Sequence, residues 1–198
     1  MKALRAAIGR PLAAALLLAA CTFASAASPA SLAKDEYRLD HQKAQAAYRL
    51  ELASCKKLQG NTKDVCKVEA RGHFQMAKAQ IDTRYKDSPA NQDKVKLAKT
   101  EAAYRLALEK CGDLSGNAKE VCKADAKAAS VAARAETRLS RASVDKGVNS
   151  RQAVNERKDA REDTADASYA AASKRCDALA GDAKSDCLVE AKKKYGKL

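Results

Sequence analysis

Residues 46–71 read AAYRLELASCKKLQGNTKDVCKVEAR, and two later stretches repeat the pattern, residues 102–127 (AAYRLALEKCGDLSGNAKEVCKADAK) and 167–192 (ASYAAASKRCDALAGDAKSDCLVEAK). In every copy the first cysteine follows the tyrosine by seven positions, and the second cysteine follows the first by eleven. Successive copies are offset by 56 and then by 65 residues. A repeat of this length is typical of an array built from one small structural unit.

A Gly-Asn or Gly-Asp pair interrupts the helical pattern at the centre of each copy. Glycine suits the left-handed conformation that ends a helix, and Asn or Asp suits the N-cap of the helix that follows. Asp64 and Glu120 stand three residues after the cap residue, where a carboxylate completes a capping box, whereas Ser185 predicts a weaker third cap. The pattern predicts three tight helical hairpins. Their turn and cap residues are Gly60 and Asn61, Gly116 and Asn117, and Gly181 and Asp182.

The two cysteines of each copy lie at equal distances from the turn, so they face each other across the hairpin. We therefore expect structural disulfides, each stabilising the fold by roughly 2–3 kcal/mol in the chain-entropy model. Redox-active pairs and metal ligands are the alternatives, but both normally use closely spaced C-x-x-C pairs, which this sequence lacks. We expect neither a metal nor a cofactor. The expected disulfides are Cys55–Cys66, Cys111–Cys122 and Cys176–Cys187.

The composition excludes a conventional globular domain with a thick core. Of the 198 residues, 45 are alanine and only 31 are Leu, Ile, Val or Phe, while the formal net charge is +13. Such values are typical of disorder, but alanine is also the best helix former. Together with the repeats, they predict an all-α protein of three repeated, disulfide-stapled antiparallel helical hairpins, extended or loosely stacked.

Breaks in the pattern divide the chain into units. We place the first hairpin at residues 34–87, the second at 88–144, a linker at 145–150 and the third at 151–198. Ser88 and Pro89 are typical of an N-cap followed by the first helical residue. Residues 144–150 lack helical signals, and the last returning helix is short.

The first 26 residues have the features of a secretory signal. Lys2, Arg5 and Arg10 precede a short apolar run, and Ala24-Ser25-Ala26 matches a cleavage site. Alternatively, Leu18-Ala19-Ala20-Cys21 resembles a lipobox, in which case residues 1–20 are removed and Cys21 is lipidated. Residues 27–33 would form a flexible tether. We expect an exported, periplasmic chain, soluble or lipid-anchored, without a membrane span.

The sequence contains no recognisable catalytic motif. Its two histidines, His41 and His73, stand on different helices without a nucleophile pattern, and we interpret both as ordinary helical residues. Basic residues are interleaved with acidic ones, which is typical of solvated helix faces. After residue 26 the net charge is still +10. We do not expect nucleic acid as a partner, because no aromatic stripe accompanies the charge.

The A-x-Y pattern, the cysteine pair and the L-x-G-N-x-K turn resemble a group of small exported bacterial proteins, some of them labelled TolA-like cell envelope biogenesis protein. The resemblance covers residues 37–198 and rests on Tyr48, Cys55, Gly60, Asn61 and Cys66 and their repeats. It implies a place in the cell envelope.

Our main functional expectation is a non-enzymatic structural, scaffold or stress-related protein. Alternatives are a cationic module that binds envelope polyanions, such as lipopolysaccharide or anionic lipid, and, less favoured, a thiol-redox protein. The partner is either an envelope protein or a polyanion, and self-association is open.

Overall fold

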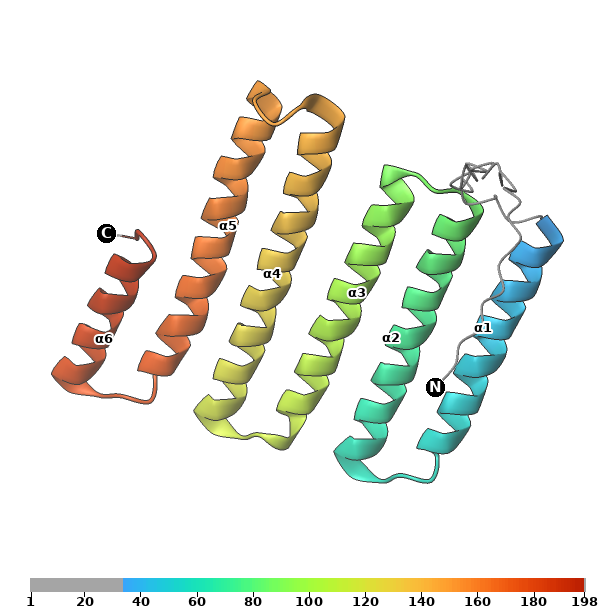
Figure 1. Ribbon diagram of the computed structural model, residues 1–198. Coiled ribbons are helices and arrows are strands. Elements are labelled where there is room, and N and C mark those ends of the chain that lie inside the picture. The colour runs from blue at the N-terminus through green and yellow to red at the C-terminus, as the bar shows by residue number, and fades with distance from the viewer. Residues whose placement is uncertain (1–33, 198) are drawn as a thin grey trace, which may run out of the picture. The chain divides into compact units, whose positions relative to one another are not determined.

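A computed structural model describes residues 34–197, and this part of the chain consists of helices and short turns, with no strand (Figure 1). The all-α class is therefore confirmed. The expected signal, Cys21 and the expected tether lie outside the described residues. In order, the helices are α1 (Lys34–Cys55), α2 (Gly60–Tyr85), α3 (Pro89–Lys110), α4 (Gly116–Lys146), α5 (Arg151–Cys176) and α6 (Gly181–Lys194), with a 3-10 turn, η1 (Cys111–Asp113).

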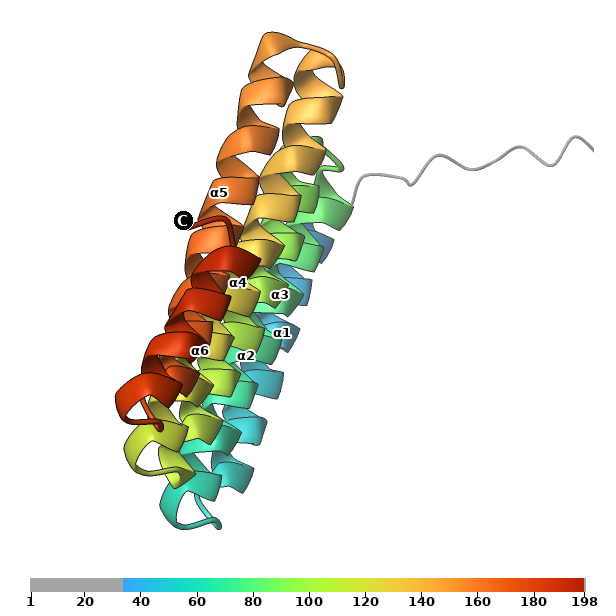
Figure 2. The ribbon, with the colours of Figure 1, turned by 90° about the vertical axis from the view of Figure 1, so that its left-hand side faces the viewer.

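Consecutive helices run antiparallel and lie side by side, so that residues 34–197 form a single layer, seen face-on in Figure 1 and edge-on in Figure 2. Extensive contacts join only helices that follow one another in the chain. The sequence left open whether the hairpins are extended or loosely stacked, and within residues 34–197 they are stacked. None of these helices combines the length and apolarity that a membrane crossing requires.

All three expected disulfides are present. Their Cα–Cα distances are 5.6 Å for Cys55–Cys66 and 5.7 Å for the other two pairs. The first cysteine of each pair is fully buried, and these three cysteines are the largest fully buried side chains in residues 34–197. The disulfides therefore close the turn end of each hairpin, in a core that is otherwise made mostly of alanine.

The most extensive helix contacts occur between hairpins rather than within them, which the sequence did not suggest. We call α2 with α3 the first seam and α4 with α5 the second seam. At the first seam, a Cβ built on Gly72 would lie only 2.9 Å from the Ala102 Cβ. At the second seam, the buried residues Ala135 and Ala160 line a common groove. Small side chains thus let helices of neighbouring hairpins approach closely.

The turn prediction is half right. Gly60, Gly116 and Gly181 adopt positive φ angles of 56°, 54° and 57°, as expected of glycines in the turn. However, each helix begins at its glycine, and no side chain caps it. The Asn or Asp that we expected at the N-cap is therefore the second helical residue, too far inside to accept from the free N–H groups. The residues whose cap role is corrected are Asn61, Asn117 and Asp182.

The capping boxes are absent for the same reason. Asp64 and Glu120 lie beyond the first turn, and they pair instead with Lys67 and Lys123, three residues further on, at 2.8 Å and 3.1 Å. The other expected cap is confirmed: the Ser88 hydroxyl accepts a hydrogen bond from the backbone N–H of Asn91 at 3.3 Å, with Pro89 in the first turn.

The second hairpin is longer than expected. Helix α4 continues to Lys146, and the break occupies only residues 147–150. An ion pair between Arg141 and Asp145, 2.9 Å apart and four residues along the helix, supports this last turn. Gly147, with a φ of 79°, ends the helix. In the third hairpin, α6 has only 14 residues, which agrees with the expected truncation.

Candidate functional site

A groove of about 490 Å³ runs beside the closest point of the first seam. Gly72 and Ala102 leave little side-chain bulk at this point, so the surface is hollowed between α2 and α3. The floor is apolar, with Val68, Leu97 and Ala98 beside the two small residues. The polar residues at the rim are Arg71, Gln75, Glu101, Arg105 and Arg134.

Glu101 is the centre of the charged rim. Its Oε1 accepts from Arg105 Nε at 2.7 Å, and its Oε2 accepts from Arg134 Nη2 at 2.5 Å. Arg105 stands one turn away on α3, whereas Arg134 reaches across from α4. One carboxylate therefore serves two guanidinium groups, and both of its oxygens are occupied.

Arg71 is the third guanidinium group of the groove, and it makes no hydrogen bond or ion pair with any of residues 34–197. The rim thus carries three positive charges against one negative charge. The side chains of Arg105 and Arg134 are 60% and 47% exposed, so that each ion pair contributes only about 0–1 kcal/mol. An anion entering the groove could therefore engage all three guanidinium groups at little cost in lost ion pairs.

The second seam provides an internal comparison, because the repeat places different charges at matching positions. Arg71 corresponds to Lys127, and Arg105 corresponds to Ala170. Ala98 and Glu101 correspond to two carboxylates, Asp163 and Asp166, which pair with Arg138 and Lys197 respectively. At these matching positions, the first seam therefore has arginines where the second seam has a lysine and an alanine, while the second seam has its own arginines, Arg157 and Arg161, elsewhere.

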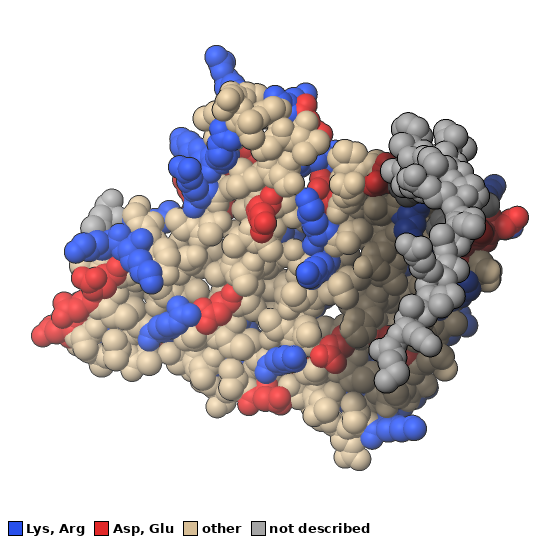
Figure 3. Space-filling view, in the orientation of Figure 1, with Lys and Arg blue, Asp and Glu red and all other residues tan. Residues whose placement is uncertain are grey.

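Elsewhere the charges are mixed. On the face shown in Figure 3, basic and acidic side chains are interspersed over the helices. Many of them form ion pairs three or four residues apart on one helix, such as Arg38 with Asp35. Such pairs are typical of a solvated helix surface. The positive charge of the chain is thus spread out, with local excesses at the groove and at a second hollow, which is lined by Arg157, Lys158, Arg161 and Lys197 against Glu162.

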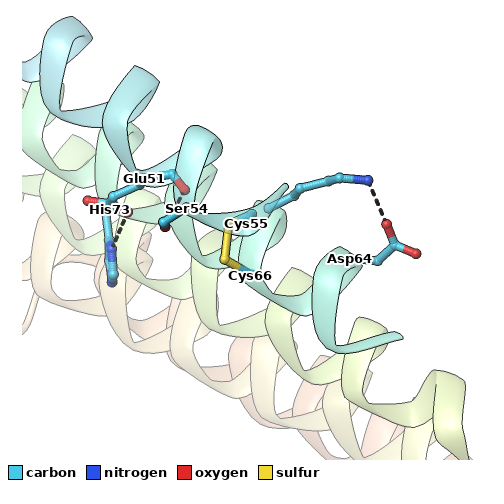
Figure 4. The surroundings of a disulfide bond; sticks show 7 residues. Glu51, Ser54, Cys55, Asp64, Cys66 and His73 are labelled. Carbon is cyan, nitrogen blue, oxygen red and sulfur yellow. Dashed lines mark hydrogen bonds and ion pairs between the residues drawn. A yellow bond between two sulfur atoms is a disulfide. The ribbon is translucent and has the colours of Figure 1, made fainter. Parts of the chain in front are cut away.

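The two histidines have local partners on separate helices. Nδ1 of His73, on α2, lies 3.0 Å from Glu51 Oε2 on α1, close to the Cys55–Cys66 disulfide (Figure 4). Nε2 of His41 is buried and makes no hydrogen bond within residues 34–197, while the Asp82 carboxylate lies 3.4 Å away. The structure does not bring the two histidines into one site.

Tyr37 holds the Asp82 carboxylate from the other side. Its hydroxyl donates a hydrogen bond of 2.9 Å to Asp82 Oδ1. This bond, together with burial, raises the pKa of Tyr37 above its ordinary value. The Tyr37 ring also packs against Tyr85, with centroids 4.6 Å apart, and Tyr48 stacks on Phe74 at 4.9 Å. These tyrosines join α1 to α2, so Tyr48 has a packing role.

All six cysteines in residues 34–197 are disulfide-bonded. No group of three or more His, Cys, Asp or Glu side chains in this part of the chain is arranged to hold a metal ion. No protein-family model, curated protein or solved structure matches the chain. What the molecule does must therefore be inferred from its layer of helices and its groove.

Sequence reasoning treated Glu101 and Arg105 as interleaved surface charge, and it did not single out Arg71 or Arg134. The signal was present in the repeat. When the copies are compared for charge rather than for shared residues, two differences stand out. Arg71 and Arg105 belong to the first seam, and the matching positions of the second seam hold Lys127 and Ala170. The contribution of Arg134 depends on the packing of α4 against α3, which no local pattern reveals.

Proposed function

We propose that the protein is a non-enzymatic structural or scaffold component of the cell envelope in an oxidising compartment. The observation that carries this proposal is the single layer formed by residues 34–197, in which each helix has extensive contacts only with its neighbours in the chain (Figure 2). A layer offers a large surface for a given chain length. The three disulfides support an exported location, because such bonds persist in oxidising compartments.

Burial of one cysteine in each disulfide favours a structural role over thiol exchange. Cys55, Cys111 and Cys176 are 0% exposed, whereas their partners Cys66, Cys122 and Cys187 are partly exposed, so an attacking thiolate has access to only one sulfur atom of each bond. We therefore expect the three bonds to resist millimolar glutathione in the folded protein. Rapid reduction of all three, followed by reoxidation without loss of helicity, would instead favour the redox alternative.

Photo-crosslinking in living cells tests the scaffold role. A photoreactive amino acid at the exposed positions Lys94 and Lys158, one on α3 and one on α5, should give adducts of defined mass with an envelope protein. The same positions in the C111A/C122A variant are the control, because an opened second hairpin should change or remove the adducts. The scaffold role fails if no position gives a discrete adduct and deletion of the protein leaves envelope integrity unchanged.

A second candidate function is the binding of envelope anions at the groove, favoured by Arg71, which has no partner among residues 34–197, beside Arg105 and Arg134. Guanidinium groups bind phosphate and carboxylate groups through two parallel hydrogen bonds. The apolar floor suits the first carbons of an acyl chain. Phosphorylated lipids, including lipopolysaccharide and phosphatidylglycerol, combine both features.

Vesicle binding tests this second function with a matched pair of variants. We expect Arg71→Gln to weaken binding to phosphatidylglycerol vesicles about fivefold, equivalent to ~1 kcal/mol. Lys127→Gln removes the same charge at the matching place of the second seam and should have a smaller effect. Binding should fall steeply as salt rises, because exposed charges are screened. Equal losses of vesicle affinity in the two variants, or an affinity that does not change with salt concentration, would rule out the groove as the binding site.

A further inference from the structure

The repeat allows the outer face of α1 to be compared with the faces that α3 and α5 turn toward the preceding hairpin. Helix α1 is the first of the described array and has extensive contacts with α2 alone. Its outward positions are nevertheless those that form seams further along the chain. Leu39 corresponds to Val95 and Ala160, Ala46 to Ala102 and Ala167, and Leu50 to Leu106 and Ala171.

Burial at these matching positions differs sharply. Ala160 and Ala171 are 3% and 2% exposed, whereas Leu39 and Leu50 are 48% and 73% exposed. We call Leu39, Ala46 and Leu50 the α1 stripe; their spacing of seven and four residues places them along one side of the helix. The end of a helical array normally presents a polar face. Here the end helix carries apolar side chains at least as large as those at the matching positions of the two seams.

The opposite end of the array is closed. Lys193 on α6 occupies the position of Gly72, where the first seam comes closest, and of Ala128 in the second hairpin. Packing another helix on α6 in the same way would bury this ammonium group and would leave no room for its side chain. The short α6 also offers little length for such contact. Head-to-tail growth, in which α6 of one chain covers α1 of the next, is therefore disfavoured.

We propose that the α1 stripe is the interface of a two-fold symmetric dimer, in which α1 packs antiparallel on α1 of a second copy. Two copies can associate either head to tail or through the same patch on each copy, which is the isologous arrangement. Because head-to-tail contact is disfavoured, the isologous arrangement remains. Antiparallel pairing also continues the seam geometry within the chain. A two-fold axis midway between Leu39 and Leu50 places each leucine against the other leucine of the second copy, with Ala46 near the axis.

The polar residues on this face do not prevent such packing. Gln42, Gln45 and Arg49 line a shallow hollow together with Ala46 and Leu50. Gln45 and Arg49 match Glu101 and Arg105, which line the groove at the first seam, so polar side chains at these places are compatible with a seam. Lys43 matches Lys99, which lies exposed at the edge of the established first seam. A lysine in this position extends its alkyl chain along the interface and keeps its ammonium group in water. One helix pair buries less surface than the about 1,200–2,000 Å² of a standard stable interface, so the dimer should dissociate on dilution.

Sedimentation equilibrium over a wide concentration range tests the proposal, using the purified chain with its disulfides formed. We expect a monomer–dimer equilibrium for the wild type and loss of the dimer in Leu50→Glu. Val189→Glu is the matched control, because Val189 on α6 is 53% exposed but lies outside the stripe. This variant should dimerise as the wild type does. Circular dichroism should show equal helicity in all three proteins.

Three results would overturn the proposal. The first is a wild-type monomer at every concentration. The second is a monomer whose melting temperature falls in Leu50→Glu. That result would mean that residues 1–33 of the same chain cover the stripe. The third is a series of oligomers that grows with concentration, which is typical of head-to-tail contact. None of these results bears on anion binding at the groove, so the two proposals stand or fall separately.

Discussion

Asn61 lies at the start of α2, but its side chain makes its hydrogen bond to α3. Its Nδ2 donates a hydrogen bond of 3.2 Å to the backbone carbonyl of Glu109, near the end of α3 in the next hairpin. The contact depends on Gly112, since a Cβ there would lie 3.0 Å from Asn61 Oδ1. The matching position in the third copy is Asp177, whose carboxylate instead pairs with Lys174 and Lys184. Asn61 therefore joins two hairpins instead of capping its own helix.

Asn61 and Asn117 should therefore differ on substitution by alanine. We expect Asn61→Ala to lower the free energy of unfolding by about 1 kcal/mol, the net value of one hydrogen bond. Asn117 makes no side-chain hydrogen bond within residues 34–197, so that Asn117→Ala should cost less than half as much. Urea unfolding of the two variants measures the difference. Equal losses would mean that the bond to Glu109 contributes nothing.

The turn glycines and the cysteine pairs could be predicted from the sequence because they act locally. Gly60 must adopt a positive φ, and Cys55 and Cys66 must meet across a short turn, whatever the rest of the chain does. The role of Asn61 could not be predicted, because its partner lies 48 residues away on a helix whose register is set by packing. Leu50 could be placed on a helix, but its exposure depends on which helix is first in the array.

At the scale of the helix, the close approach of α2 and α3 depends on Gly72. Substitution by leucine would force side-chain atoms into Ala102, where even a Cβ would be 2.9 Å from the Ala102 methyl carbon. Overpacking of this kind typically costs about 1–3 kcal/mol. We expect Gly72→Leu to lower the melting temperature by several degrees, while His73→Leu, on the exposed next position, changes it little. Similar melting temperatures would show that the seam tolerates a wider spacing.

The three disulfides should differ in importance because the helices they hold differ in length. Helix α6 has 14 residues and a limited contact with α5, whereas α1 has 22 residues and two aromatic contacts with α2. Isolated helices shorter than about 12–15 residues are marginal in water. The third disulfide therefore holds an element that packing alone secures only weakly.

Hydrogen exchange of paired-cysteine variants tests this difference. In C176A/C187A we expect amide protection to be lost throughout residues 181–194, with the rest of the chain unaffected. In C55A/C66A, α1 should keep most of its protection because Tyr48 and Phe74 still stack. The interpretation is wrong if both variants lose the same protection or if α6 stays protected without its disulfide.

At the scale of the whole molecule, residues 34–197 form one array because seams of small residues join hairpins that disulfides have already closed. The seams, more than the disulfides, determine whether the three hairpins form a layer with a defined groove or remain independent and flexibly linked. The groove at the first seam and the broad surface proposed for a scaffold both exist only if the hairpins form the layer. The composition alone could not predict it, because alanine favours helix without specifying which helices meet.

Nuclear Overhauser spectroscopy on the isotopically labelled protein asks directly whether the hairpins are stacked. The Gly72 Hα protons and the Ala102 methyl group belong to different hairpins and come together only at the first seam. We expect strong cross-peaks between them, as strong as those between the stacked rings of Tyr48 and Phe74 within the first hairpin. Cross-peaks within hairpins, with none between Gly72 and Ala102, would contradict the layer and with it the groove.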